Sequence, residues 1–395
     1  MTRRLRFLAL LWIAVLPAFA QRPYVVLVSL DGFRYDYAEK YGATNLLDLA
    51  KADASAELIP SYPSITFPNH ISIVTGMYPE HHGIVANTFF DPARKQEYSM
   101  RQASTEGDWL ESMPLWVLAE EQKVKAATMF WPMSDAEIAG VRPSYWYKYD
   151  GSVPDEERVA RVEGWLKLPE KDRPHFITLY FSDTDSAGHK FGPDSPEEAA
   201  AVKHVDTLVG GLWKDIQAMV LPVDLIVVSD HGMQSTEGFV NLSDYADLSK
   251  VRVENSGAFA LIYAPDHATA EQTYLALKGK SPKFDVYRRA EVPAGLHFSD
   301  NERIGDLVVI AREPVILMTQ KPTQDIERGE HGYDPAQFRT MHGIFYAAGP
   351  DVRTGVRLEP FVNVEIAPFI AQILGLSVPA GLDGSGKALD GALRQ

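Results

Sequence analysis

Three segments of the sequence place carboxylate and imidazole side chains directly after apolar runs. Asp31 follows the first run, Asp185 and His189 follow the second, and Asp230 and His231 follow the third. A single Asp after a strand is usually a turn residue or a helix cap. Three such segments, two of them with a His at i+1 or i+4, instead favour a metal site. The chain has no cysteine, and Asp and neutral His are the ligands that suit zinc when no thiolate is available.

The apolar runs themselves predict strands that are buried on both faces. Residues 24–30, 176–181 and 223–228 are rich in apolar and β-branched side chains and do not alternate with polar ones. Between the last two runs, Ser195, Pro196 and Glu198 form a capping box that starts a helix. Strand, helix, strand implies a parallel crossover, so we expect an α/β fold with a mostly parallel central sheet covered by helices on both faces. Ligands of such sheets bind beyond the carboxyl ends of the strands, where the three segments meet.

A candidate nucleophile, Thr66, lies in the segment 63–70. Pro68 suits the first turn of a helix, which puts Thr66 at or near the helix N-terminus. There the backbone N–H groups and the helix dipole favour an anion, such as a threonine alkoxide or a phosphoryl group. On local sequence alone, however, a helix cap is the stronger interpretation of Thr66.

Two further histidines compete for a role as metal ligand. His331 lies in a glycine-flanked segment that permits a tight loop, and His342 lies beside the apolar run 344–348. A lone His in either place is more often structural. Local sequence therefore leaves both open.

The N-terminus has the features of a secretory signal peptide over residues 1–20. Three arginines precede the apolar run 7–16, and Ala18-Phe19-Ala20 offers a cleavage site before Gln21. The run is too short to span a bilayer comfortably, so we expect export and no stable membrane anchor. Removal of the three arginines changes the formal charge from −15 to −15 − 3 = −18.

The acidic charge and the absence of cysteine limit the partners and the compartment. A surface this negative disfavours nonspecific nucleic-acid binding, although a local cationic site can still bind a small phosphate compound. The absence of Cys excludes disulfides and fits a bacterial periplasm. No protein partner is inferable.

Five segments together resemble the nucleotide pyrophosphatase/phosphodiesterase family of the alkaline phosphatase superfamily. They occur in the family's order, from about Tyr24 to Leu376. The segments are Asp31-Gly32-Phe33-Arg34, Thr66-Phe67-Pro68-Asn69-His70, Asp185-Ser186-Ala187-Gly188-His189, Ser229-Asp230-His231-Gly232-Met233 and His331-Gly332-Tyr333-Asp334. The resemblance implies an alkaline-phosphatase-like catalytic domain over residues 21–395. Strand and turn signals at about 251–323 predict a smaller α/β lobe within it.

The resemblance also implies two zinc sites. The ligands of one are Asp185, His189 and His331. The ligands of the other are Asp31, Asp230, His231 and the oxygen of Thr66. It therefore favours His331 over His342.

The remaining family positions concern the substrate. Asn87 matches an asparagine that hydrogen-bonds a phosphate oxygen, and Phe67 and Tyr180 match aromatic positions that sandwich a nucleobase. Core packing is the alternative interpretation of both aromatics. Thr66 would attack phosphorus and form a covalent phosphothreonine, which water then hydrolyses. The expected reaction is zinc-dependent hydrolysis of nucleotide phosphodiesters and pyrophosphates to nucleoside 5'-monophosphates.

Other functions remain open at this point. A choline or lysophospholipid phosphodiesterase, or a phosphonoacetate hydrolase, could use the same two-metal site. A non-catalytic zinc-binding exoprotein is a different class, and the retention of every proposed ligand counts against it. Met133 stands where the family usually has glycine, which leaves the shape of the substrate pocket undecided.

Overall fold

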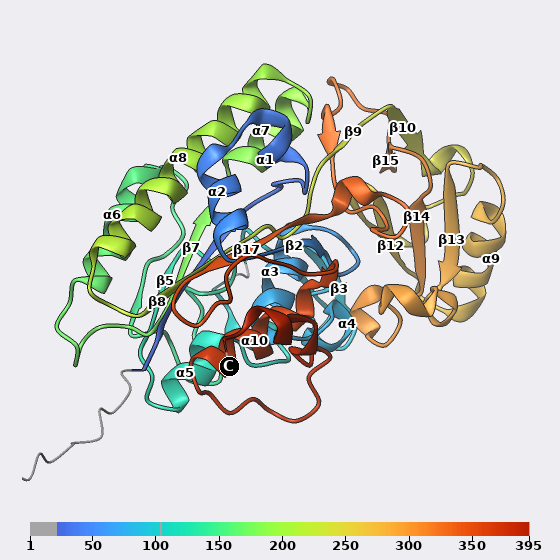
Figure 1. Cartoon of the computed structure of the whole chain (residues 1–395). Helices are drawn as coiled ribbons and strands as arrows, with labels where there is room; N and C mark the ends of the chain where they lie inside the picture. Colours follow the sequence, from blue (N-terminus) through green and yellow to red (C-terminus); the bar gives the residue numbers. More distant parts are fainter. Residues whose placement is uncertain (1–21, 103–104, 395) are drawn as a thin grey trace, which may run out of the picture.

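The computed structural model describes residues 22–102 and 105–394. Within these residues the main element is a nine-stranded sheet (Figure 1). Its strands, in spatial order, are β18 (Val356–Arg357), β2 (Ala54–Ile59), β17 (Gly343–Ala348), β8 (Val223–Val228), β1 (Tyr24–Leu30), β7 (Phe176–Phe181), β5 (Ala126–Met129) and β6 (Tyr145–Trp146), with β19 (Phe361–Val362) also paired to β2. The expected alkaline-phosphatase-like α/β class is confirmed.

The centre of the sheet is parallel, as expected. Strand β1 runs parallel to β7 on one side and to β8 on the other. Helix α8 (Pro196–Ala218) makes the predicted crossover between β7 and β8, and the Ser195 hydroxyl oxygen accepts the N–H of Glu198 as its cap. The reciprocal half of the capping box is absent, because the Glu198 carboxyl is buried without a hydrogen-bond partner. Strand β17 runs antiparallel to β8 and β2, so the sheet is mixed.

Helices cover both faces of the sheet (Figure 1). Along β1, Val25 and Leu27 join one apolar cluster, whereas Val26 and Val28 join the other. The first cluster includes side chains of α3 (Thr66–Thr75), α5 (Leu115–Glu121) and α10 (Ile366–Ile373). The second includes side chains of α1 (Tyr37–Tyr41), α2 (Thr44–Ala52), α6 (Asp155–Leu166) and α8. Because successive side chains of a strand point to opposite faces, this division explains why the β1 segment is apolar throughout.

A second, antiparallel sheet lies where the smaller lobe is expected. Its strands are β11 (Arg252–Ser256), β12 (Phe259–Tyr263), β14 (Leu307–Ala311) and β13 (Phe284–Arg288). Helix α9 (His267–Leu277) packs on it through Tyr274 and Leu277, which share an apolar cluster with Ile262 and Val309.

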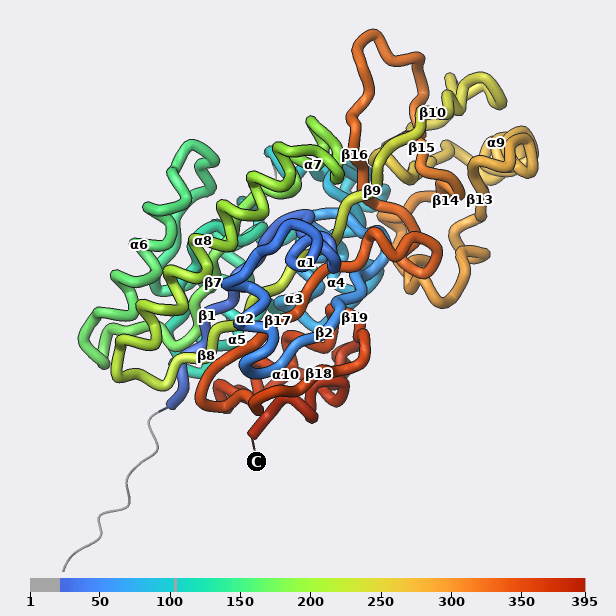
Figure 2. The backbone as a smooth tube through the Cα atoms, turned by 45° about the horizontal axis from the view of Figure 1, so that its top comes forward, coloured from blue at the N-terminus to red at the C-terminus, as the bar shows by residue number. Residues whose placement is uncertain are grey.

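Further short elements complete the fold. They are α4 (Pro79–His82), α7 (Asp183–Phe191) and the strand pairs β3 (Thr88–Asp91) with β4 (Gln96–Ser99), β10 (Gly238–Asn241) with β15 (Val315–Met318), and β9 (Gln234–Ser235) with β16 (Gly329–Glu330). Figure 2 shows β16 beside α7, so the second sheet's connections reach the edge of the first.

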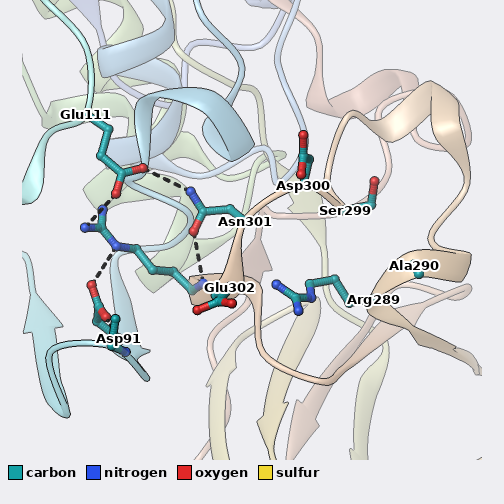
Figure 3. A pocket seen from close by; sticks show the side chains of 10 residues that line it. Asp91, Glu111, Arg289, Ala290, Ser299, Asp300, Asn301 and Glu302 are labelled. Carbon is teal, nitrogen blue, oxygen red and sulfur yellow. Dashed lines mark hydrogen bonds and ion pairs between the residues drawn. The ribbon is translucent and has the colours of Figure 1, made fainter.

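Arg303 ties the smaller sheet to the core through Asp91 and Glu111, two residues that are labelled in Figure 3. Its guanidinium lies 2.9 Å from Asp91 Oδ2 and 2.9 Å from Glu111 Oε1, and it donates to the carbonyl oxygens of Gly83 and Trp109. Only 5% of Arg303 is exposed. A planar guanidinium with several donors can satisfy all of these acceptors at once, which a lysine cannot do.

The predicted signal peptide, residues 1–20, lies outside the described residues. In the part of the chain that the structure describes, no helix has the length and apolar character needed to cross a bilayer.

Candidate metal centre and adjoining pocket

The carboxyl ends of the central strands bring the predicted ligands together. Asp31 directly follows β1, Asp185 lies in the first turn of α7 just after β7, and Asp230 and His231 follow β8. Gly32 has φ +67°, and a Cβ there would lie 2.9 Å from Cα of Asp185. A glycine is needed at this position both for the left-handed backbone and for the close approach of the two loops.

One group consists of Asp185, His189 and His331. The Nε2 atoms of the two histidines are 3.0 Å apart. Nε2 of His189 lies 3.3 Å from Oδ1 of Asp185, and Nε2 of His331 lies 3.5 Å from the same oxygen. His331 reaches this group from the loop after β16, so the structure brings together three ligands from distant parts of the sequence.

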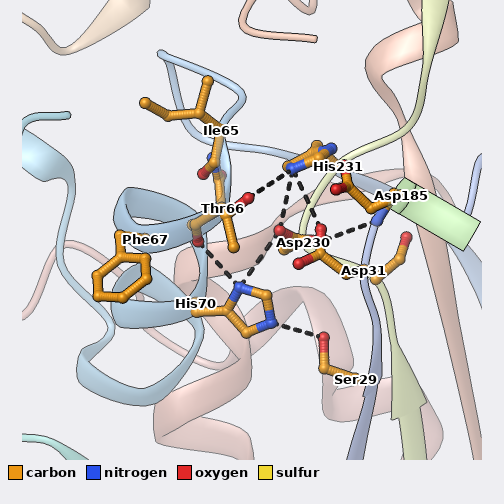
Figure 4. A network of polar contacts seen from close by, with 12 residues as sticks. Ser29, Asp31, Ile65, Thr66, Phe67, His70, Asp185, Asp230 and His231 are labelled. Carbon is orange, nitrogen blue, oxygen red and sulfur yellow. Dashed lines mark hydrogen bonds and ion pairs between the residues drawn. The ribbon is translucent and has the colours of Figure 1, made fainter. Parts of the chain in front are cut away.

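The second group consists of Asp31, Asp230, His231 and Thr66 (Figure 4). Nε2 of His231 lies 3.1 Å from Asp230 Oδ2 and 3.4 Å from Asp31 Oδ1. Oγ1 of Thr66, the first residue of α3, lies 3.4 Å from the same nitrogen. All the residues predicted to hold metal therefore meet in one place.

The carboxylates of this cluster suit a cation. Within the described residues, Asp31 Oδ1, Asp185 Oδ1 and Asp230 Oδ2 are buried and accept no hydrogen bond. Burial raises the pKa of Asp31 well above its ordinary value, and the charges of Asp230 and Asp185 raise it further. Unpaired buried carboxylate oxygens are costly unless a proton or a cation satisfies them. The donor set of carboxylates, imidazoles and a hydroxyl fits divalent cations such as zinc.

The histidines are held in the tautomer that binds metal. Nδ1 of His231 faces the carbonyl oxygen of Gly232, and Nδ1 of His331 faces that of Ser64. Nδ1 of His189 likewise faces the carbonyl oxygen of Gly329. A carbonyl can only accept, so each Nδ1 carries the proton and each Nε2 presents its lone pair to the cluster.

His342, the competitor of His331, is used elsewhere. Its Nδ1 bonds to Glu57 and its Nε2 lies 2.9 Å from the carbonyl oxygen of Pro335. Both ring nitrogens are engaged away from the cluster, so His342 has none left for a metal.

His70, which ends the segment Thr66-Phe67-Pro68-Asn69-His70, also lies at the site. Its Nδ1 lies 3.2 Å from Asp230 Oδ2 and 2.9 Å from the carbonyl oxygen of Thr66, and its Nε2 lies 2.9 Å from Ser29 Oγ. The i+4 spacing from Thr66 places both residues on one face of α3 and was the signal that could have identified it. His70 therefore contacts the same oxygen of Asp230 that faces His231.

Glu327 was not identified from sequence at all. Its Oε2 lies 3.0 Å from Nδ1 of His189. No pattern in the sequence connects these two residues, because Glu327 lies in the loop between β15 and β16.

A cavity of about 650 Å³ adjoins the cluster. Thr66, Asp31 and Asp185 line it, together with aromatic residues that include Phe67 and Tyr149. Asn87 lies next to this wall, because its Oδ1 accepts the N–H of Phe67 at 2.9 Å. With Oδ1 so engaged, the side-chain amide group of Asn87 keeps its N–H donors for another acceptor.

Tyr180, which was expected to stack on a base, also lines this cavity, but the structure buries most of it. Only 9% of Tyr180 is exposed, and its hydroxyl donates to Asp31 Oδ2 at 2.5 Å. Tyr149, on the wall of the same cavity, is 53% exposed. Its position after a short edge strand gave no distinguishing signal in the sequence. Tyr149 is thus the most exposed of the aromatic residues that line the cavity.

The alkaline-phosphatase-like fold and the cluster at the carboxyl ends of its strands define a hydrolase with the ligand set of a metal-dependent enzyme. The family model of type I phosphodiesterase / nucleotide pyrophosphatase matches residues 25–334. The chain belongs to this family of hydrolases acting on phosphodiester bonds.

Named relatives agree with this assignment. The chain is 36% identical to mouse ectonucleotide pyrophosphatase/phosphodiesterase family member 1, over 96% of this chain and 44% of the mouse protein, so it spans less than half of that relative. It is 34% identical to human bis(5'-adenosyl)-triphosphatase, over 90% of this chain and 78% of the human protein. The structure is also similar to that of murine ectonucleotide pyrophosphatase/phosphodiesterase 5, solved as an inactive threonine-to-alanine variant with AMP. The two superpose with a TM-score of 0.89 at 30% identity, over 94% of this chain and all of the murine one.

Proposed function

We propose that the chain is a zinc-dependent phosphodiesterase and nucleotide pyrophosphatase that uses Thr66 as its nucleophile. The observation that carries this proposal is the position of Thr66 Oγ1. It lies at the N-terminus of α3, 3.4 Å from Nε2 of His231, and beside a cavity that can hold a substrate. An inactive threonine-to-alanine variant of the murine relative supports the choice of a threonine.

The proposed metal ions are two zincs, held by the two groups described above. When bound, they supply positive charge that favours the Thr66 alkoxide and offsets the charge of the phosphate oxygens. Without substrate, three carboxylates opposite two divalent ions leave one net positive charge, which suits a singly charged diester.

The proposed hydrolysis has two steps. The Thr66 oxygen forms a bond to phosphorus while the bond to the leaving oxygen breaks, which gives a phosphothreonine. Water attacks phosphorus in the second step, restores the Thr66 hydroxyl and releases the monophosphate. The Nδ2 amide of Asn87 donates to a phosphate oxygen, since Oδ1 is held by the Phe67 N–H. Two inversions give net retention at phosphorus.

A nucleotide is the substrate class that the cavity favours. Phe67 and Tyr149 offer aromatic surface to a base, which stacks on such rings whatever its identity. Arg101 and Lys148 also line the cavity and disfavour a cationic choline group. AMP in the murine relative and the name of the human triphosphatase support a nucleotide. We further propose export to a bacterial periplasm, on the features of residues 1–20.

Hydrolysis of p-nitrophenyl thymidine 5'-monophosphate at mildly alkaline pH tests the proposal, with p-nitrophenyl phosphate alongside. We expect strong cleavage of the diester and little of the monoester, lost on metal stripping and restored by zinc. A protein that holds two zincs and cleaves neither this diester nor a dinucleoside polyphosphate would contradict it.

A further inference from the structure

We propose that Tyr180 is a positioning residue of the metal centre, whose hydroxyl fixes Asp31 so that one carboxylate oxygen faces the metal nearest Thr66. The inference rests on the proposed function, because it assumes that Asp31 binds a metal. It assigns Tyr180 a role in metal affinity rather than in contact with the base.

The backbone holds Tyr180 rigidly against Asp31. Tyr180 lies in β7 opposite Ser29 of the neighbouring parallel strand β1, and the N–H of Asp31 donates to the carbonyl oxygen of Phe181 at 2.9 Å. Two adjacent strands of a buried sheet thus set the separation of the two side chains. The hydroxyl of Tyr180 reaches Oδ2 of Asp31 at 2.5 Å from this fixed position.

The bond divides the two oxygens of Asp31. Oδ2 accepts the Tyr180 hydroxyl, whereas Oδ1 accepts no hydrogen bond and lies 3.4 Å from Nε2 of His231. The two oxygens of Asp230 are divided in the same way. Its Oδ1 accepts the N–H of Gly32 at 3.2 Å, and its Oδ2 lies 3.1 Å from Nε2 of His231. Each carboxylate of this group therefore has one oxygen held by a donor and one that would hold the metal, and for Asp230 the second oxygen also lies 3.2 Å from Nδ1 of His70.

The ring of Tyr180 is committed to packing. It lies edge-on to His70, with centroids 5.3 Å apart, and His70 is the residue that contacts Asp230. The ring also meets Tyr149 edge-on at 6.3 Å. The ring also lines the cavity, but these contacts leave only 9% of Tyr180 exposed to a ligand.

Removal of such an outer hydrogen bond typically weakens metal binding by ~10–100-fold. Tyr180→Phe removes the hydroxyl alone and keeps the ring. We expect the full-length protein with this substitution to bind one of its two zincs at least about tenfold more weakly and the other as tightly as the unsubstituted protein does. Competition with a chromophoric chelator measures both affinities directly.

Tyr98→Phe is the matched control. Tyr98 is a buried tyrosine whose hydroxyl finds no hydrogen-bond partner among the residues that the structure describes, and it packs against Phe89 rather than the metal centre. We expect this variant to bind both zincs as the unsubstituted protein does.

The activity of Tyr180→Phe gives a second readout. Activity that this variant loses at limiting zinc should return at excess zinc, and its KM for the nucleotide diester should change by less than about twofold.

The outcomes separate the inference from the proposed function. An unsubstituted protein that binds no zinc contradicts the proposed function itself. Two unchanged zinc affinities in Tyr180→Phe, with or without a raised KM, overturn the positioning role. Equal weakening of both zincs, matched by Tyr98→Phe, also overturns it, because that result reflects general loss of stability.

Discussion

Nδ1 of His189 lies 3.0 Å from Oε2 of Glu327. The loop that carries Glu327 is held against α7, because the N–H of Arg328 donates to the carbonyl oxygen of His189 at 2.9 Å. A carboxylate on the far nitrogen of a metal-binding histidine fixes the ring and raises its basicity. Glu327 therefore supports the group formed by Asp185, His189 and His331.

Glu327→Gln should weaken zinc binding at that group by about tenfold, because the amide lacks the negative charge. Chelator competition measures the loss. Glu313→Gln is the control, since Glu313 pairs only with Lys283 at the surface. Identical zinc release from both variants would remove Glu327 from the metal centre.

Thr66→Ala should abolish diester hydrolysis while leaving two zincs bound. The alanine has no oxygen to attack phosphorus, whereas six protein ligands of the two groups remain. Thr66→Ser keeps a hydroxyl and should retain measurable turnover. Steady-state assays with metal analysis check both variants, and full activity in Thr66→Ala would exclude the covalent step.

Tyr149→Ala should raise KM for a nucleotide diester by about tenfold, the size of effect expected when a base loses a stacking partner. KM for bis(p-nitrophenyl) phosphate should change little, because that substrate has no base. Tyr147→Ala is the control, as Tyr147 packs against Trp165 and does not line the cavity. An equal rise of KM for both substrates would argue against stacking.

His81 should make a pH-dependent contribution to stability. Burial lowers the pKa of His81, but its bond to Asp383 and the charges of Glu80 and Asp300 outweigh burial and raise it above the ordinary value of 6.5. Because the pKa of His81 is higher in the folded state than in the unfolded state, protonation of His81 stabilises the folded protein. This stabilisation is complete at pH values below the unfolded-state pKa, and it is lost as the pH rises through the folded-state pKa. The difference in Tm between the unsubstituted protein and His81→Asn should thus be larger at pH 6 than at pH 9. Thermal scans of both proteins with zinc in excess measure it, and a difference that grows with pH would contradict the assignment.

The fold class and the place where the candidate ligands meet could be predicted from the sequence. Apolar runs such as 24–30 and 223–228 must be buried on both faces, and the crossover helix between β7 and β8 starts at its capping Ser195. Parallel strands put their carboxyl ends at one edge. The residues after them, Asp31, Asp185 and Asp230, therefore had to meet there.

Tertiary structure alone decided which side chains surround those ligands. Local sequence left His331 and His342 open, and the structure brings His331 beside His189 while Glu57 and Pro335 engage both nitrogens of His342. The contact of Glu327 with His189 depends on where a distant loop crosses α7.

The same applies to the aromatic residues. Tyr149 and Tyr180 are alike in type, yet one is half exposed on the cavity and the other is buried against Asp31. Sequence periodicity shows which residues enter the core and which strand ends meet, since both follow from backbone geometry. Which atom a buried hydroxyl or carboxylate reaches depends on distances of a few tenths of an ångström between segments far apart in the chain, and only the packed structure sets these.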